Sequence, residues 1–381
     1  MNPTDSDPVE NPLYLAKLKV TRSPYERLFF DNYLIVIPVI YFFRGIFFYL
    51  TVKRFPDDFT DGIKIIVEIS VLLFFVFSDR FLRSIAHELV VLFGDRLLTP
   101  KDGDEASDSR FLREIDLQCN AVHRFWIGGI MSAILMVYYA VSLDGLINIF
   151  NPEPYGILIF IYNQLNIIPN TIYAYFLGVS FWKIFAVSMM LRRLPQRFDI
   201  QVRFDHPDDA GGLLPIGTLA LRMIYVFLIP TMISVFILVG PRLQVFSEVS
   251  LPATDRPVVL NMAAVALFVS ILGSVMGLEL IFRFHKVMKT QYSELIKGLH
   301  SLSGEILELR KNIIFSSTVQ DSETLKQAAE KIDVLNQIYQ KQKLANCWPV
   351  NRQILTGLLA SQTFLFSQLI ALWNIVSGIL S

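Results

Sequence analysis

Residues 206–215 read His-Pro-Asp-Asp-Ala-Gly-Gly-Leu-Leu-Pro, and they open directly into an apolar run that continues from 216 to 239. The loop is rich in turn-forming residues, whereas the run carries a single charged side chain, Arg222. A helix needs about 20 largely apolar residues to cross the hydrocarbon core of a bilayer. The run is long enough, so it predicts a membrane-spanning helix that is entered from a polar loop.

The composition of the whole chain indicates that lipid is its solvent. Of the 381 residues, 53% are hydrophobic and 31 are Phe, but only 18% are charged, against about a quarter in a typical soluble domain. The 34 basic residues balance the 34 acidic ones, so no basic field suggests a nucleic-acid partner. The sequence therefore predicts an all-α integral membrane helical bundle whose first partner is the lipid bilayer.

Seven apolar segments are candidate spans. They are 33–52, 63–78, 126–147, a long one within 156–191, 216–239, 258–281 and 353–380. The second is short and carries Lys64 and Glu68, so a chain of six spans remains an alternative. The fourth contains several amide side chains and Pro169 between 162 and 171, which predicts an interrupted helix near the outer interface.

Basic residues are unevenly distributed between the connections. If the N-terminus is cytosolic, 26 Lys and Arg residues fall on the cytosolic side and five on the outer side, with Lys64 at the outer end of the second span counted among the five. Cytosolic loops of membrane proteins carry such an excess. We therefore predict seven spans, a cytosolic N-terminus and an external C-terminus.

This topology divides the chain into three parts. Spans one to six occupy 1–281 with cytosolic loops at 79–125 and 192–215, a cytosolic segment follows at 282–346, and the last span lies within 347–381. The first of these loops starts with apolar residues at helical spacing. It is expected to form a helix that either lies at the interface or extends the second span.

The cytosolic segment begins with apolar residues at alternating intervals of four and three, which is the heptad pattern of coiled coils: Met288, Tyr292, Leu295, Leu299, Leu302, Ile306, Leu309 and Ile313. A second apolar stripe lies between 325 and 339. Because the chain must return to the membrane, we predict an antiparallel helical hairpin. It either closes on itself or uses residues 283–345 to form a homo-oligomer or to bind a cytosolic protein.

The loop before the fifth span carries four side chains that titrate or bind hard cations: Asp205, His206, Asp208 and Asp209. One interpretation is a divalent-cation site or an acid–base pair. The other is structural, with Asp208 or Asp209 capping the following helix and Gly211 and Gly212 permitting a tight turn. Both interpretations remain open at this point.

Polar side chains within the spans form the candidate permeation or substrate path, because ionisable groups at membrane depth usually face protein or water: Arg44, Glu68, Asn166, Asn170, Lys183, Arg222, Glu279 and Asn374. Arg44 and Glu68 lie at depths that allow them to pair. Lys183 and Arg222 have only Glu279 as an obvious counter-charge, which leaves an excess of positive charge suited to an anion. The structural alternative is that these groups form ion pairs or reach the interface.

Signatures of common catalytic sites are absent from the sequence. It contains no Gly-x-Ser-x-Gly, P-loop or dinucleotide-binding pattern, and His87-Glu88 lacks the second His of a zinc protease. Cys119 and Cys347 have no spacing typical of a zinc site. We do not expect an enzyme.

Residues 206–213 resemble a loop, His-Pro-Asp-x-Ala-Gly-Gly-Leu, of a set of bacterial multi-pass membrane proteins of unknown function, and Trp348-Pro349-Val350 is similar to their segment before the last span. The resemblance implies a bacterial inner-membrane location and no particular activity. The expected function is a channel or transporter for a small ion or solute, with the charge balance favouring an anion. The alternative is a membrane-embedded signalling or assembly scaffold that acts through the hairpin.

Overall fold

The computed structural model describes residues 24–52, 62–101, 103, 107–142, 156–203, 206–239, 256–315 and 348–380, with a few further positions between 327 and 337. Nearly all of these residues belong to eight helices: α2 (Pro24–Val52), α4 (Gly62–Gly94), α5 (Ser107–Cys119), α6 (His123–Ser142), α8 (Gly156–Arg197), α9 (Leu214–Val239), α10 (Arg256–Phe315) and α12 (Arg352–Leu380).

Several of these helices are suited to a membrane. Within the described residues, four helical segments are long and apolar enough to cross one: Ser107–Val137, Ile167–Arg197, Leu214–Ile233 and Ala264–Gly298. They overlap the third to sixth predicted spans. The predicted spans 33–52, 63–78 and 353–380 are helical as parts of α2, α4 and α12, and their crossing of a membrane stays a prediction.

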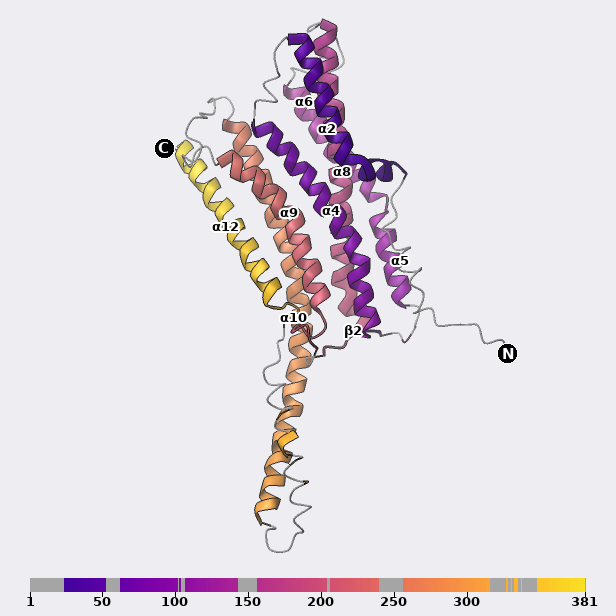
Figure 1. Cartoon of the computed structure of the whole chain (residues 1–381), viewed down its shortest axis with the longest axis vertical. Helices are drawn as coiled ribbons and strands as arrows, with labels where there is room; N and C mark the ends of the chain where they lie inside the picture. Colours follow the sequence, from indigo (N-terminus) through magenta and orange to yellow (C-terminus); the bar gives the residue numbers. More distant parts are fainter. Residues whose placement is uncertain are drawn as a thin grey trace, which may run out of the picture.

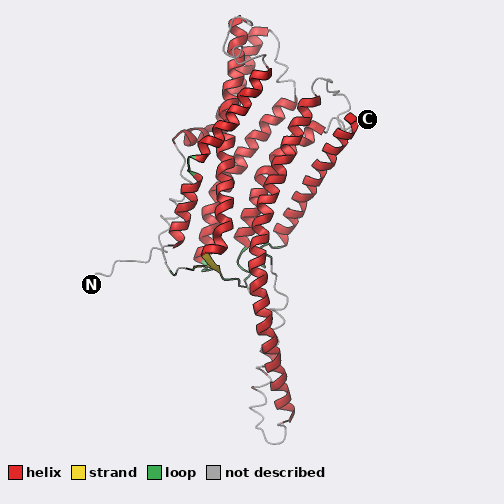
Figure 2. Ribbon diagram, turned by 180° about the vertical axis from the view of Figure 1, so that it is seen from behind, coloured by secondary structure: helices red, strands yellow, loops and turns green. Residues whose placement is uncertain are grey.

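The helices lie side by side along the long axis of the molecule (Figures 1 and 2). α9 is central, because it packs against α4, α10 and α12, while α6 packs against α8. The last part of α10 leaves the bundle and projects from one end, and α12 ends at the opposite end (Figure 1). The two ends of the bundle therefore differ, because a helix projects from only one of them.

A short antiparallel sheet lies at the end from which α10 projects. β1 (Leu98–Pro100) follows α4, and β2 (Phe198–Ile200) follows α8. Leu98 lies opposite Ile200, and Pro100 lies opposite Phe198. Because each strand follows its helix almost directly, the sheet holds the ends of α4 and α8 together.

We call this end the base of the bundle and define it as residues 85–101, 107–119, 187–203, 206–219 and 280–291. The base has a completely covered apolar core, with no exposed surface on these side chains: Leu89, Leu92, Leu97, Leu191, Leu194, Leu213, Ile216, Leu219, Phe284 and Met288. Such a core is typical of a protein that folds in water.

Outside the base, large apolar side chains face outward on several helices: Leu34, Ile35, Phe42, Phe43, Trp126, Ile130, Ile134, Val265, Phe268, Leu359, Phe366 and Ile370. An apolar surface of this extent is unfavourable in water and favourable in hydrocarbon. The apolar surface of these helices agrees with a membrane location.

Two helices continue further than the sequence indicated. The predicted interruption near Pro169 is wrong, because α8 is an uninterrupted helix of 42 residues from Gly156 to Arg197. Proline is tolerated in membrane helices when nearby groups satisfy the backbone. The polar side chains around Pro169 do not end the helix, and Thr171 donates a hydrogen bond to the Ile167 carbonyl of the same helix. α4 runs without a break through the predicted boundary at residue 79, so the helix of the predicted second span continues to Gly94, and its crossing of a membrane stays a prediction.

α10 contains both the sixth predicted span and the first arm of the predicted hairpin in one helix of 60 residues. At about 1.5 Å per residue it is about 90 Å long. Met288, the first residue of the predicted heptad seam, is completely buried in the base. The second arm lies almost wholly outside the described residues, so the hairpin itself stays a prediction.

Candidate functional site

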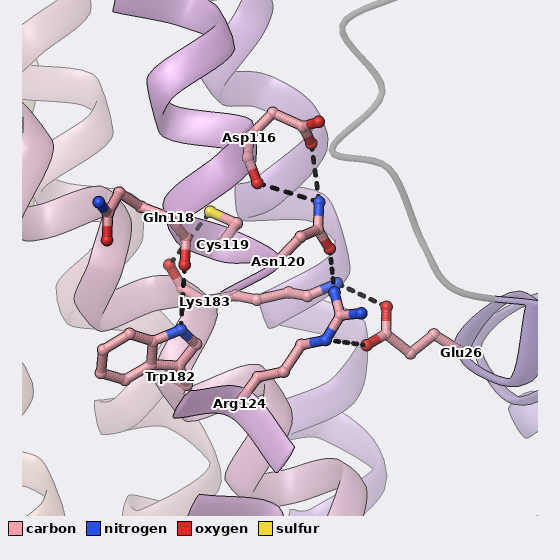
Figure 3. A network of polar contacts seen from close by, with 8 residues as sticks. All are labelled: Glu26, Asp116, Gln118, Cys119, Asn120, Arg124, Trp182 and Lys183. Atoms are coloured by element: carbon pink, nitrogen blue, oxygen red, sulfur yellow. Dashed lines mark hydrogen bonds and ion pairs between the residues drawn. The ribbon is translucent and has the colours of Figure 1, made fainter. Parts of the chain in front are cut away.

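Three charged side chains from three helices meet inside the protein, near the first turns of α2 and α6 (Figure 3). The Nζ atom of Lys183 on α8 donates a hydrogen bond of 2.7 Å to Oε2 of Glu26 on α2. The Nε atom of Arg124 on α6 lies 3.6 Å from Oε1 of the same carboxylate. The exposed fractions of these side chains are 2% for Lys183, 3% for Glu26 and 10% for Arg124. We call these three residues the ionic cluster.

Helix ends help to explain the position of the acid. The N-terminus of a helix carries a partial positive charge, which favours Glu26 in the first turn of α2. The same effect disfavours Arg124 in the first turn of α6. The Glu26 carboxylate offsets this, and the guanidinium also lies 4.6 Å from the ring centroid of Phe125.

The turn between α5 and α6 orients the arginine. Nη1 of Arg124 donates to the side-chain oxygen of Asn120. The Asn120 amide in turn donates to the Asp116 carboxylate at 2.9 Å and to the Asp116 carbonyl at 3.0 Å. A fixed chain of polar groups therefore holds the guanidinium beside Glu26 (Figure 3).

The same turn is attached to α8 at the lysine and at the residue before it. The indole Nε1 of Trp182 donates to the carbonyl of Gln118 at 3.1 Å. The buried Cys119 thiol lies 3.8 Å from the carbonyl of Lys183, to which it donates. These contacts place the end of α5 against the segment of α8 that carries the lysine.

The ionic cluster combines one carboxylate with two cations, so the three groups carry one net positive charge. Burying a charge is costly unless it is paired and hydrogen-bonded. The arrangement can hold one negatively charged group between two cations. It offers a binding function rather than a nucleophile or a general base.

Arg222 and Glu279 lie in two other groups of ion pairs near the base. Arg222 Nη1 is 3.0 Å from Oε1 of Glu88 on α4, with 43% of the arginine side chain exposed. Glu279 pairs with Arg192 of α8 at 2.9 Å and with Arg283 of its own helix at 2.8 Å. Glu279 is therefore not the counter-charge of Lys183 or Arg222, which each have a carboxylate of their own.

The structure brings few of the predicted path residues together. Lys183, Arg222 and Glu279 belong to three separate groups of charges. Asn170 lies in α8 and is partly buried. Four other predicted path residues lie in described helices, but their side chains are outside the described part of the structure: Arg44, Glu68, Asn166 and Asn374. Whether the eight residues line one path stays a prediction.

Asp208 organises the loop before α9. Its Oδ1 accepts hydrogen bonds from the backbone N–H groups of Ala210 at 2.9 Å and Gly212 at 3.0 Å, and its Oδ2 accepts one from Leu214 at 3.2 Å. Nδ1 of His206 lies 2.9 Å from the same carboxylate. This geometry is the capping role of the structural interpretation.

The titration of Asp208 reflects these contacts. Burial is the largest single influence and opposes ionisation, but the hydrogen bonds from Gly212, Ala210, His206 and Leu214 together outweigh it. The pKa of Asp208 is consequently lowered from its ordinary value of 3.8. The carboxylate is charged at neutral pH and bound to the backbone around it.

A divalent-cation site at this loop gains no support from the part of the chain that the structure describes. Those residues hold no group of three or more His, Cys, Asp or Glu side chains that could hold a metal ion. Asp205 lies outside the described residues. Asp209 is exposed and has a φ of 55°, so it takes part in the turn. The cation proposal stays a prediction.

The segment from β2 to the loop before α9 contacts α10 where this helix leaves the bundle. The Gln291 side chain donates from Nε2 to the carbonyl of Ile200, and its Oε1 accepts from the Val202 N–H at 3.0 Å. A side chain at Gly211 would collide with Val202 and come within 3.1 Å of Met288. We call residues 198–203 and 206–213 the collar of α10.

A second contact joins α10 to the segment before α12. The His285 ring is stacked on the Trp348 ring with 3.8 Å between centroids, and Phe282 packs on the same indole with 5.9 Å between centroids. α10 is therefore held on two sides at the point where it leaves the bundle.

Sequence reasoning missed Glu26, Arg124 and Glu88 as partners of the intramembrane charges. Glu26 belongs to a polar N-terminal segment, and Arg124 belongs to a basic loop. The missed signal is the need of each buried cation for a carboxylate at the same depth.

No protein-family model matches the chain, and no match is found among curated proteins or among solved structures.

Proposed function

We infer that the protein is a multi-pass membrane protein that acts as a signalling or assembly scaffold through α10. The observation that carries this proposal is the continuity of α10, which is one helix from Arg256 to Phe315. Its first half packs against α9 among the apolar helices, and its last part projects beyond the base (Figure 2). A rigid helix of this kind transmits a shift in one compartment to the other.

The base supports the same proposal. The collar binds α10 through Gln291, and α9 begins directly after the collar at Leu214. A rotation or translation of α9 relative to α10 therefore acts on the exit point of the projecting part. Two-state movements of packed helices are a common means of signal transfer.

The proposed topology has seven spans, with the base and the projecting part in the cytosol of a bacterium. Helices α2, α4 and α12 contain 29, 33 and 29 residues, which is enough to cross a bilayer. Exposed basic residues gather at the base, among them Arg96, Lys101, Arg193, Arg203, Lys286 and Lys289. This distribution agrees with a cytosolic base.

Photo-crosslinking in intact cells tests the scaffold proposal. A benzophenone amino acid replaces Leu307, which is 57% exposed on the projecting part, and, as the matched control, Phe268, which is 67% exposed in the apolar part of the same helix. We expect a discrete protein adduct from position 307 and only lipid adducts from position 268. Equal results at both positions would overturn the proposal.

A channel or transporter for a small ion or solute is the second candidate, and the ionic cluster is the observation that favours it. A net positive group inside a membrane protein is costly and often marks a path for ions. Flux of a panel of anions and cations into liposomes tests this candidate. Flux through the wild type that is lost in Lys183→Met and kept in Arg222→Gln supports transport past the ionic cluster, whereas no flux from folded protein excludes the tested ions as substrates.

A further inference from the structure

We propose that Lys183 and Arg124 form a binding site for a small monovalent anion, and that the Glu26 carboxylate occupies this site in the structure. The inference does not rest on the proposed scaffold function, because the three residues lie on α2, α6 and α8 and the scaffold function depends on α10. A carboxylate side chain that fills an anion site is a competitor for any free anion of similar size.

The electrostatics of the site favour negative charge beyond what Glu26 supplies. Two cations lie within 3.6 Å of one carboxylate. The N-terminal turns of α2 and α6 meet at the same place, and each adds partial positive charge. The three side chains of the ionic cluster carry one net positive charge, in a place where water contributes little screening, and the Asp116 carboxylate, joined to Arg124 through the Asn120 amide, offsets part of it.

The Glu26 carboxylate lies closer to Lys183 than to Arg124. Lys183 receives a short hydrogen bond of 2.7 Å. The Nε of Arg124 is buried and makes no hydrogen bond, and its ion pair with the carboxylate is 3.6 Å long. Glu26 belongs to the first turn of α2, and from this position its two oxygens lie at unequal distances from the two cations. A free anion has no such constraint.

The size of the group follows from what it replaces. The site holds a carboxylate between an ammonium and a guanidinium, so chloride, nitrate and formate are of suitable size and charge. A guanidinium and an ammonium are also the donors that bind such anions most strongly. When the first turn of α2 moves away, or when Glu26 loses its charge, two buried cations need a counter-ion from solution.

Thermal unfolding of the purified full-length protein in detergent tests the proposal. Chloride, nitrate or formate replaces gluconate at constant ionic strength, with wild type and Glu26→Gln compared. We expect the midpoint of Glu26→Gln to rise saturably, by about 2 °C or more once the anion exceeds its dissociation constant tenfold. The wild type, whose site is filled by Glu26, is expected to shift by less than half as much.

Glu88→Gln is the matched control, because it removes a carboxylate from the exposed Arg222 pair instead of the buried cluster. It is expected to respond no more than the wild type does. The double variant Glu26→Gln/Lys183→Met is expected to lose the response of Glu26→Gln. Equal responses in all variants would show a general salt effect and overturn the proposal, as would an unresponsive, folded Glu26→Gln protein.

Two further arms keep the result decisive. Anionic phosphatidylglycerol added to the micelles separates a lipid headgroup from a free anion, and stabilisation by the lipid alone contradicts a small-anion site. If Glu26→Gln does not yield folded protein, the same thermal-unfolding test is made with Glu26→Asp. Its carboxylate keeps the charge, and its side chain is one methylene shorter, so it fills the site less well. A weaker saturable response is expected there, and none would overturn the proposal.

Discussion

The ammonium of Lys183 and the carboxylate of Glu26 are separated by 157 positions in the chain and joined by a 2.7 Å hydrogen bond. Each side chain is at least 97% buried. Removing Lys183 leaves the buried Glu26 carboxylate with only its longer 3.6 Å contact to Arg124, and breaking a buried ion pair in this way costs about 3–5 kcal/mol. We expect Lys183→Met to lower the free energy of unfolding by this amount. Glu26→Leu/Lys183→Met should lower it by much less than the sum of the single changes in denaturant titrations, and simple additivity would contradict the pairing.

Arg222→Gln is expected to have a small effect. The arginine side chain is 43% exposed in its pair with Glu88, and exposed ion pairs contribute about 0–1 kcal/mol. The same denaturant titration should therefore rank Arg222→Gln far below Lys183→Met. A comparable loss for the two variants would show that Arg222 is buried in the membrane, as the sequence alone suggested.

Asp208→Ala is expected to destabilise the protein by about 1–3 kcal/mol, because three backbone N–H groups lose their acceptor. Asp209→Asn at the neighbouring exposed position is the control, and it should change little since Asn tolerates a φ of 55°.

The contribution of Asp208 also depends on pH. Its pKa is lowered in the folded protein, so the contribution is complete above the ordinary pKa of 3.8 and is lost as the pH falls through the lower folded value. Acid unfolding followed by tryptophan fluorescence should show a shallower loss of stability below about pH 4 for Asp208→Ala than for wild type. Identical profiles would contradict a charged cap.

Gly128→Ala and Gly129→Ala form a matched pair on α6. A Cβ atom at Gly128 would lie 2.8 Å from the Tyr175 ring and 3.0 Å from the Tyr175 carbonyl of α8, whereas a Cβ at Gly129 meets no atom within 4 Å. We expect Gly128→Ala to cost about 1–3 kcal/mol and Gly129→Ala to be neutral or slightly stabilising. Thermal midpoints of the two variants check the close approach of α6 and α8.

Gln291→Leu is expected to loosen the collar around α10. The variant removes the acceptor of the Val202 N–H and the donor to the Ile200 carbonyl. Hydrogen exchange of the Val202 amide should accelerate about tenfold, which corresponds to the loss of one hydrogen bond. The exposed Ser293→Ala variant, on the same helix, should leave this exchange rate unchanged.

The sequence predicted the helical class and the positions of the helices, because apolar runs of span length are strong signals. It failed at Pro169, where the amide-rich segment was predicted to break a helix that in fact continues to Arg197. Polar side chains within a membrane helix often bind neighbouring groups without interrupting it, as Thr171 does here.

The site was only half predictable. Lys183 is conspicuous as a cation in an apolar run, but Glu26 lies in a polar segment, where a carboxylate attracts no notice. Their contact depends on how α2 packs against α8, which no local pattern encodes. The loop at Asp208 shows the opposite case, because one of the two interpretations of the sequence was a cap of the following helix, and Asp208 accepts a hydrogen bond from Leu214, the first residue of α9.

The distance in sequence between Glu26 and Lys183 also constrains how the protein is made. At about 5–20 residues per second, a ribosome needs roughly 8–30 s to travel the 157 positions between them. During that time α2 has been synthesised, but Lys183, which later pairs with Glu26, has not. We therefore expect the docking of the first helix against α8 to be a late step of biogenesis, and a chain that stops before residue 183 to be degraded faster than the full chain.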